Sequence, residues 1–314
     1  MARLIRVPHL ASLLVVTCAR EIDDLIAHPS LARAFARKGP LLNRLLVAGL
    51  DRQFRHHGDV LPAFRPKEDP SRVAAQRQLF ARLDALSERG VWPSAPVTEM
   101  GRYVATGADR RNAEAALAYA VAWPFIGSAS ASTEDDAYKP LGRHLWRLHR
   151  RTALAREPAS PRGLALRLAG LDRRARATIL DHVGGDLYGL HAVEITLANA
   201  RTILEAMREA MSGIPEGAPA TGASLAWAAI RTAPERVVRQ TGATSLTLPG
   251  VDGRIPPHTL VLLQMRRSLG PDLASGYEFA SRHWSACPAR RFVMGLFTAV
   301  AEAALALKSA EVAP

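Results

Sequence analysis

Hydrophobic residues recur every three or four positions along most of the chain, which is the spacing of one face of a helix. In the last such stretch Phe292, Leu296 and Val300 follow this spacing. The pattern predicts helices at 20–28, 30–37, 41–56, 70–88, 109–122, 136–155, 172–183, 189–211, 223–232 and 288–308. Breaks that carry Pro or Gly predict loops at 62–70, 90–96, 157–163 and 212–222.

Two regions carry strand patterns instead. Leu13–Thr17 is rich in aliphatic and β-branched residues, and 244–264 holds two strand-like runs around turn signals at 249–250 and 252–253. We find no internal repeat, and we expect 1–314 to form a single domain. The predicted fold class is mainly α with small β-sheets, an α+β arrangement without alternating βαβ units.

Composition narrows the class of partner. The formal net charge is +12, and all but four of the 41 basic residues are arginines, which are spread over the chain with acids between them. Aromatic residues make up only 6%. A nucleic-acid binder would show a basic stripe and stacking aromatics, so we expect no nucleic-acid partner.

The N-terminus begins with arginines followed by apolar residues, as a signal peptide does, but Pro8 and His9 interrupt it and no clean cleavage site follows. No uninterrupted apolar run reaches the ~20 residues of a membrane span. Two cysteines, Cys18 and Cys287, fit a reducing compartment. We therefore expect a cytoplasmic protein without a membrane partner.

One of these cysteines stands where a helix is predicted to begin. Cys287 precedes Pro288, which suits the first position of a helix, and Arg290 and Arg291 follow. Unpaired backbone N–H groups and nearby positive charge favour a thiolate, the form that binds metals or attacks electrophiles. A small buried hydrophobic side chain is the alternative reading.

Other common chemical motifs are absent from the sequence. It has no glycine-rich phosphate loop, no zinc signature and no G-x-S-x-G elbow. His191 and Glu194, three apart on a predicted helix, form at most a weak metal-binding pair. His144 and His149 lie among arginines, and we interpret them as part of a solvated helix face.

The order of stretches from 227 to 300 resembles the C-terminal third of the cytochrome P-450 family, the haem-thiolate monooxygenases. WAAIRTAP is followed by VVRQ with Arg239, then by RIPPHTLVLLQ and SACPARRFV. Ile255, Pro256 and Thr259 match the I-P-x-G-T motif of the family, with His258 in place of its glycine. The resemblance implies a compact cytochrome P-450-like fold.

The resemblance also implies a cofactor, haem b, and an axial ligand to its iron, Cys287. Arg239 would meet one haem propionate, because guanidinium groups pair well with carboxylates. The segment DPSRVAAQRQLF resembles the part of the family that meets the other propionate, which leaves Arg77 or Arg72 as its partner.

Further roles follow from the same resemblance. Phe279 and His283 would lie beside the cofactor, before the cysteine. The helix 189–211 stands where the family places its distal helix, and Glu194 and Thr196 would deliver protons there.

The implied function is an oxidoreductase, an iron-binding haem monooxygenase that inserts oxygen from O2 or peroxide into an apolar small molecule. An acidic ferredoxin or flavodoxin-type electron donor would dock on arginines near the cysteine: Arg266, Arg267, Arg282, Arg290 and Arg291.

Three departures from the family keep an alternative open. Ala228 stands where the family has the Glu of its Glu-x-x-Arg pair, so Arg231 has lost that partner. Ser281, Trp284 and Ser285 replace glycines before the cysteine, and Ile195 separates the acid from the threonine of the distal helix. The alternative is a degenerate relative without oxygenase activity that acts as a haem-binding or interaction protein.

Overall fold

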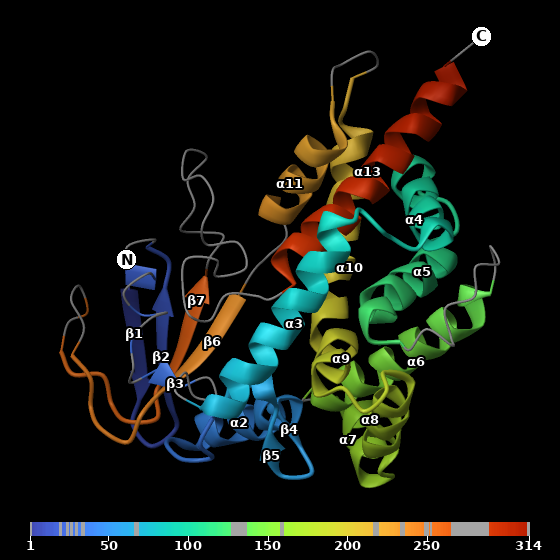
Figure 1. The fold of residues 1–314 in the computed structure, drawn as a ribbon. Coiled ribbons are helices and arrows are strands. Elements are labelled where there is room, and N and C mark those ends of the chain that lie inside the picture. The colour runs from blue at the N-terminus through green and yellow to red at the C-terminus, as the bar shows by residue number, and fades with distance from the viewer. Residues whose placement is uncertain are drawn as a thin grey trace. The chain divides into compact units, whose positions relative to one another are not determined.

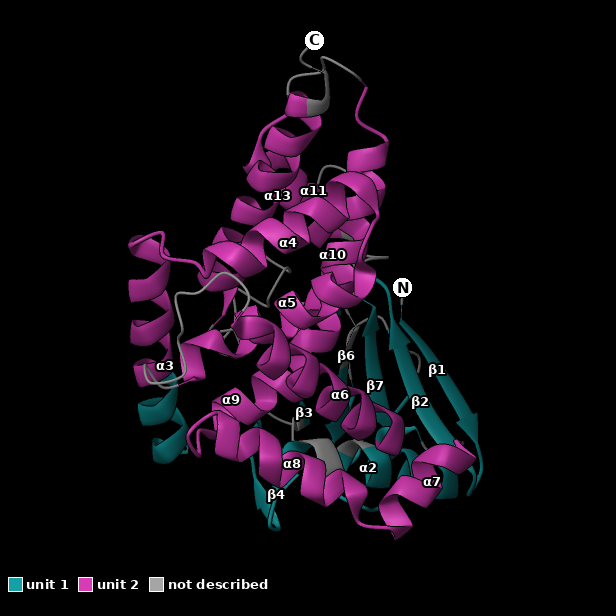
Figure 2. Cartoon of the chain, turned by 90° about the vertical axis from the view of Figure 1, so that its right-hand side faces the viewer, with its two compact units in different colours: residues 1–76, 156–159, 234–287 teal, residues 77–155, 160–233, 288–314 magenta. Residues whose placement is uncertain are grey.

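The computed structural model of the chain divides into two compact units, each assembled from segments that are distant in sequence. Figure 2 colours them teal (1–76, 156–159 and 234–287) and magenta (77–155, 160–233 and 288–314). The structure describes residues 2–18, 21–22, 25, 28, 31–32, 35–65, 69–126, 137–157, 160–215, 220–232, 236–247, 251, 253–264 and 289–312.

A five-stranded sheet in the order β1-β2-β7-β6-β3 organises the first unit (Figure 1). Its strands are β1 (Ala2–Val7), β2 (Ala11–Val16), β3 (Leu31–Ala32), β6 (Arg236–Thr241) and β7 (Leu260–Gln264). β1 and β2 form a hairpin, and β2 continues into a parallel pairing with β7 that sets Leu14 opposite Val261. Each of the two strand regions predicted from the sequence therefore contributes a strand to one sheet, whereas the first run of 244–264 forms only an isolated bridge between Leu246 and Ile255.

The larger core cluster of this unit lies on one face of the sheet, and a smaller one of Phe35, Val47 and Leu260 lies on the other. Burial alternates along β2, as a strand with one covered face requires, so that Leu14 and Val16 point inward. They pack with Ile255, Val261 and Leu263 from the second strand region. The remaining elements are α2 (Leu41–Phe54), β4 (Arg55–His56), β5 (Asp59–Val60) and a 3-10 turn (Pro62–Phe64).

The second unit is helical. The helix α3 (Pro70–Glu88) leads into it, and the other helices are α4 (Ser94–Thr106), α5 (Arg110–Ala122), α6 (Tyr138–Arg156), α7 (Pro161–Leu168), α8 (Leu171–His182), α9 (Leu187–His191), α10 (Leu197–Ser212), α11 (Gly222–Thr232) and α13 (Arg290–Val312). A 3-10 turn (Trp123–Phe125) follows α5, and a π-helical turn (Ala192–Thr196) joins α9 to α10.

Small residues let these helices approach closely. α5 is alanine-rich and buried along most of its length. A Cβ atom on Gly142 of α6 would overlap the backbone carbonyl of Ala115 in α5, so only glycine allows this approach. On α13, Leu296, Phe297 and Val300 are buried, and the helix packs against α4 and α11.

The stretch Arg290–Ala310 of α13 is long and apolar enough to cross a membrane by length and composition alone. The core helix of a globular unit meets the same criterion, and this helix packs within the second unit. The sequence-based expectation considered only uninterrupted apolar runs and therefore did not identify this stretch.

Most predicted helices are confirmed, α3 with the same bounds, but three predictions are wrong. The predicted helix 30–37 instead contains the strand β3, and residues 35–37 are not helical. The helix α4 begins inside the predicted loop 90–96, with Pro96 in its first turn, where proline is tolerated. α7 begins inside the predicted loop 157–163. Its Pro161 occupies the first helical position, and the Ser160 hydroxyl accepts from Gly163 N at 3.1 Å.

The predicted helix 20–28 lies largely outside the described residues. The expectation of a single domain stays a prediction, because the compact units are assembled from interleaved segments.

Candidate functional site

The turn before β7 contains the residues that match the I-P-x-G-T motif. His258 stands in the glycine position with φ +57°, a left-handed conformation that glycine adopts most easily. The Pro256 carbonyl accepts hydrogen bonds from the hydroxyls of Thr241 (3.0 Å) and Thr259 (2.8 Å). Thr259 N in turn donates to the Thr241 hydroxyl at 2.8 Å, which ties this turn to the end of β6.

β6 carries Arg239 into the interior of the first unit. The residue lies opposite Val261 of β7 and is only 7% exposed. Its Nη1 donates to the neighbouring Val238 carbonyl at 2.9 Å, and among the described residues no carboxylate forms an ion pair with it. Burial, and secondarily the positive charge of Arg72, lowers the pKa of Arg239 to about 10.

Arg72 reaches the same region from the first turn of α3. Asp69 caps this helix: its Oδ1 accepts from the backbone N–H groups of Ser71 (2.9 Å) and Arg72 (3.3 Å). The Arg72 side chain is buried, and its Nη1 donates to the Arg65 carbonyl at 3.1 Å. The cap therefore sets where α3 begins, and thus where Arg72 enters the core.

Two guanidinium groups buried near each other make this region suitable for an anion. Burying a cation is costly unless an opposite charge accompanies it, and guanidinium groups pair best with carboxylates or phosphates. The donor set thus fits the propionates of a haem. Of the two candidates for the second propionate, Arg72 is buried and electrostatically coupled to Arg239, whereas Arg77 is exposed on α3.

The cysteine segment lies outside the described residues. Cys287, Phe279 and His283 belong to it, so their predicted roles stay predictions. The description resumes at Ala289, whose carbonyl accepts from Val293 N at 2.7 Å as α13 begins.

Part of the predicted electron-donor surface can be placed. Arg291 is exposed, and its Nη1 lies 3.8 Å from a carboxylate oxygen of Asp84 and of Glu88 on α3. These acids offset the basic charge that the sequence analysis assigned to this surface. Arg290 is half-buried, and Arg266, Arg267 and Arg282 lie outside the described residues.

In the second unit, Glu194 lies on the π-helical turn and is almost fully buried. Its Oε1 forms an ion pair with Arg176 of α8, 3.0 Å from the Nε atom. π-helical turns are rare and occur often at functional sites. The sequence indicated Glu194 as a candidate acid but not Arg176, the cation that neutralises it, because Arg176 lies on another helix.

Thr196 is half-buried on the same turn. Side chains two positions apart on a helix do not face each other, so the backbone directs Glu194 and Thr196 to different sides. Their predicted roles in proton delivery stay predictions, with Glu194 already engaged by a cation.

Sequence reasoning missed His149, which was interpreted as part of a solvated face. That prediction is wrong for this residue, which is buried and donates from Nδ1 to the Val193 carbonyl of the π-helical turn at 2.8 Å. The Trp146 ring stacks on it at 5.4 Å. The signal was present in the sequence, because His149 continues the buried stripe of Leu145, Leu148 and Thr152.

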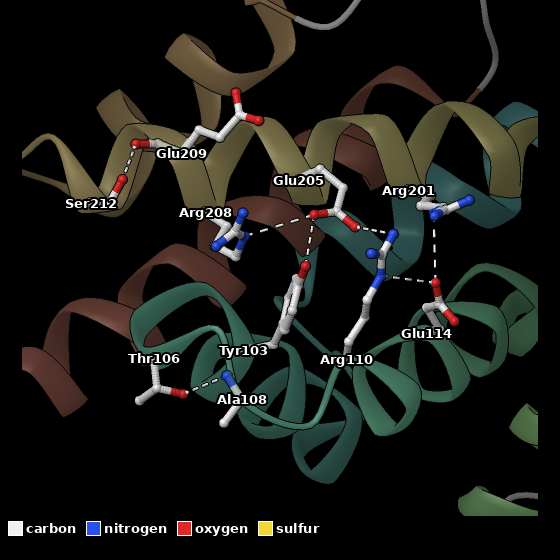
Figure 3. A network of polar contacts seen from close by, with 10 residues as sticks. All are labelled: Tyr103, Thr106, Ala108, Arg110, Glu114, Arg201, Glu205, Arg208, Glu209 and Ser212. Carbon is white, nitrogen blue, oxygen red and sulfur yellow. Dashed lines mark hydrogen bonds and ion pairs between the residues drawn. The ribbon is translucent and has the colours of Figure 1, made fainter.

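A polar network secures α10, which follows the π-helical turn (Figure 3). Glu205 of α10 accepts from the Tyr103 hydroxyl of α4 at 2.7 Å, and its other oxygen lies 3.0 Å from Arg110 Nη2 of α5. Burial and the Glu205 carboxylate raise the pKa of Tyr103. Glu114 of α5 meets Arg201 of α10 at 3.6 Å. The network joins three helices and holds the axis of α10 in place.

Among the described residues no group of three or more His, Cys, Asp or Glu side chains could hold a metal ion. The pair of His191 and Glu194 therefore gains no further metal ligand from the described part of the chain.

Ala228 and Arg231, which the resemblance equates with the Glu-x-x-Arg pair of the family, both lie on α11. Arg231 is exposed at the end of α11, with its guanidinium 5.8 Å from the centre of the Trp227 ring. Ala228, at the position of the family's glutamate, is also exposed.

Comparison with known proteins identifies the fold. No family sequence model and no curated protein matches the chain. Solved structures do match: the structure of GfsF has a TM-score of 0.55 at 14% identity, over 99% of this chain and 86% of that one. For the P-450 RauA, complexed with a biosynthetic intermediate of aurachin RE, the TM-score is 0.56 at 13% identity, over 96% and 85% of the two chains.

A myxobacterial cytochrome P-450 in complex with myristic acid also has a TM-score of 0.56, at 17% identity, over 98% of this chain and 85% of that one. The chain therefore has the fold of the cytochromes P-450. The expectation of a mainly helical, compact fold of this type is confirmed.

The burial of Arg239 leads to a prediction about stability without a cofactor. A pKa lowered from 12.5 to about 10 corresponds to a penalty on the order of 3 kcal/mol for the charged form. The unfolded chain binds the proton more tightly, so this penalty applies below pH ~10 and fades as the pH rises toward the unfolded value. We expect Arg239→Met to raise the free energy of unfolding of the haem-free protein at pH 7 by about 1–3 kcal/mol in urea denaturation.

The matched control is Arg77→Met on the exposed side of α3, which should change stability by less than about 0.5 kcal/mol. A loss of stability in Arg239→Met would show that the buried cation is compensated within the protein.

The ion pair at the π-helical turn predicts strong coupling between two residues. Arg176→Met leaves the Glu194 carboxylate buried without this cation and should destabilise the protein by about 3 kcal/mol. Adding Glu194→Leu removes the buried charge and should restore most of that loss. Urea denaturation of the two single variants and the double variant measures the coupling. Additive effects, or an equal loss in the exposed control Arg173→Met, would contradict the pairing.

Proposed function

We propose that the chain is a haem-thiolate oxygenase that inserts oxygen from O2 or peroxide into an apolar small molecule. Haem b would be held by Cys287 as the axial ligand, with Arg239 and Arg72 paired to its propionates. The observation that carries the proposal is the buried Arg239 guanidinium, without a carboxylate partner among the described residues, on the strand before the I-P-x-x-T turn.

Each residue has a defined task in this proposal. Arg239 and Arg72 orient the cofactor by fixing its two carboxylates, and their burial strengthens that attraction because water does not screen it. Cys287 supplies the thiolate at the start of the last helix. When bound in this way, haem supplies the chemistry of O–O cleavage, which a thiolate ligand favours.

The distal residues have a narrower role in the proposal. Glu194 is held by Arg176, so its oxygens are not both available to pass a proton. Thr196 is half-buried on the same turn and can donate its hydroxyl proton. This arrangement makes peroxide, which brings its own protons, the simpler oxygen source. O2 with an acidic ferredoxin or flavodoxin-type donor remains the second source.

The substrate class rests on neighbouring structures and is part of the proposal. One structure with this fold is described in complex with myristic acid, and another with a biosynthetic intermediate of aurachin RE. An apolar small molecule is the substrate class that we propose for this chain.

A second candidate function is supported by α11. The Glu-x-x-Arg pair of the family is replaced by the exposed Ala228 and by Arg231 over Trp227. A protein that lacks this pair can keep the fold and still bind haem weakly, as a degenerate relative that serves as a haem-binding or interaction protein.

The ligand to iron is tested by spectroscopy. We expect the protein, reconstituted with haem, reduced and exposed to carbon monoxide, to show the red-shifted Soret band of thiolate ligation. Cys287→Ala should abolish that band, whereas Cys18→Ala should leave it unchanged. A haem-loaded protein without the band, or a band that survives in Cys287→Ala, would contradict thiolate ligation by this residue.

The propionate partners are tested by haem titration. Arg239→Met removes a buried charge-assisted pair and should weaken haem binding by about tenfold or more, while Arg77→Met should not. Quenching of tryptophan fluorescence during the titration gives the dissociation constant. Failure of the wild-type protein to retain haem would favour the second candidate function.

A further inference from the structure

The helix α2 buries polar side chains and exposes leucines. Asn43 and Asp51 are 2% and 4% exposed, whereas Leu45 on the opposite face is 57% exposed. Leu41, Leu42 and Leu46 are also exposed. A helix at the surface of a globular unit normally turns its apolar face inward, so this orientation needs a cause.

Hydrogen bonds on the buried face supply that cause. Asn43 Oδ1 accepts from Ser12 N at 3.1 Å, and its Nδ2 donates to the carbonyls of Ser12 (2.7 Å) and His258 (3.1 Å). The Asp51 carboxylate pairs with Arg37 (3.1 Å) and Arg55 (2.7 Å). Rotating the leucines inward would break all of these contacts, so their exposure is built into the fold.

The β1–β2 hairpin extends the exposed apolar surface. Leu41 N donates to the His9 carbonyl at 3.1 Å and Leu42 N to that of Leu10 at 2.8 Å, which places the start of α2 against the hairpin turn (Figure 1). Seven apolar side chains of these two elements, each 40–57% exposed, form what we call the leucine patch: Ile5, Val7, Leu10, Leu41, Leu42, Leu45 and Leu46.

Cations surround the leucine patch. Arg3, on the same face of β1 as Ile5 and Val7, Lys38 before α2 and Arg44 on α2 are all exposed. The sequence has no Asp or Glu in residues 1–20 or 25–50, the two stretches that build the patch. The patch is therefore apolar at its centre, basic at its edge and free of acidic residues in its own segments.

These features favour one kind of occupant. A second copy of the chain, docked by a twofold axis, would set the same arginines against each other. The patch contains no Trp, Tyr or Phe, whereas protein interfaces rely on aromatic anchors and make little use of Leu and Val. Aliphatic side chains flanked by Lys and Arg are what an interfacial helix uses on anionic lipid.

We propose that the leucine patch binds the surface of a membrane that contains anionic phospholipids. The exposed aliphatic side chains enter the headgroup boundary, and Arg3, Lys38 and Arg44 contact lipid phosphates. The protein lies on the membrane and does not span it. The proposal differs from the sequence-based expectation of no membrane partner, and it does not depend on the proposed function.

The test is flotation of the full-length protein with vesicles of phosphatidylcholine alone or mixed with phosphatidylglycerol. We expect flotation only with the mixed vesicles. Leu41→Gln with Leu45→Gln should weaken membrane binding by about tenfold or more, because two leucine side chains would no longer enter the bilayer. Lys38→Gln with Arg44→Gln should weaken it by roughly tenfold or more and reduce its sensitivity to salt.

The matched control is Leu168→Gln, which alters an 81% exposed leucine on α7, outside the leucine patch. It should float like the wild type, and thermal unfolding should show that every variant is folded. Equal flotation of the Leu41/Leu45 variant and the wild type overturns the proposal, as does no flotation of the wild type. A dimer in size-exclusion chromatography that the Leu41/Leu45 changes dissociate would instead make the patch a self-association surface and also overturns it.

Discussion

The burial of two guanidinium groups is the constraint on which the candidate site depends. Arg239 is carried inward by a strand in the sheet and Arg72 by the first turn of a capped helix, so neither can move to the surface without disturbing regular structure. The chain accepts a buried cation whose pKa is lowered to about 10. Such a cost persists in a fold when something outside the chain balances it. The proposed dianionic planar cofactor would balance it directly and would tie the stability of this unit to occupancy of the site.

Two other residues of the proposed chemistry have partners within the chain. The acid on the π-helical turn is neutralised by Arg176, and the arginine at the end of α11 lies on Trp227. Both residues thus make contacts within this chain that differ from the roles the resemblance implies. Under the proposed function, the engagement of Glu194 by Arg176 makes peroxide, which brings its own protons, the simpler oxygen source.

Buried polar contacts determine which face of α2 and of α6 points inward, where hydrophobicity or charge alone would favour another face. Asn43 turns the leucines of α2 outward, and His149 satisfies a carbonyl of the π-helical turn from within a helix that is basic on its surface. In each case a buried group that must be hydrogen-bonded outweighs the preference of nearby apolar or charged residues. The same rule links the leucine patch to the core, because the hydrogen bonds of Asn43 reach the turn that precedes β7.

The sequence by itself determined the helical content, the bounds of α3, a strand in each of the regions 13–17 and 244–264, and the turn in which His258 replaces a glycine. These features depend on residues a few positions apart, and local periodicity and turn chemistry record them. Only the tertiary structure decided that β2 pairs with β7, that Arg72 rather than Arg77 is buried, and that Arg176 meets Glu194. Those outcomes join residues far apart along the chain. They are set by which surfaces pack and which buried polar groups find partners, and no local pattern contains that information.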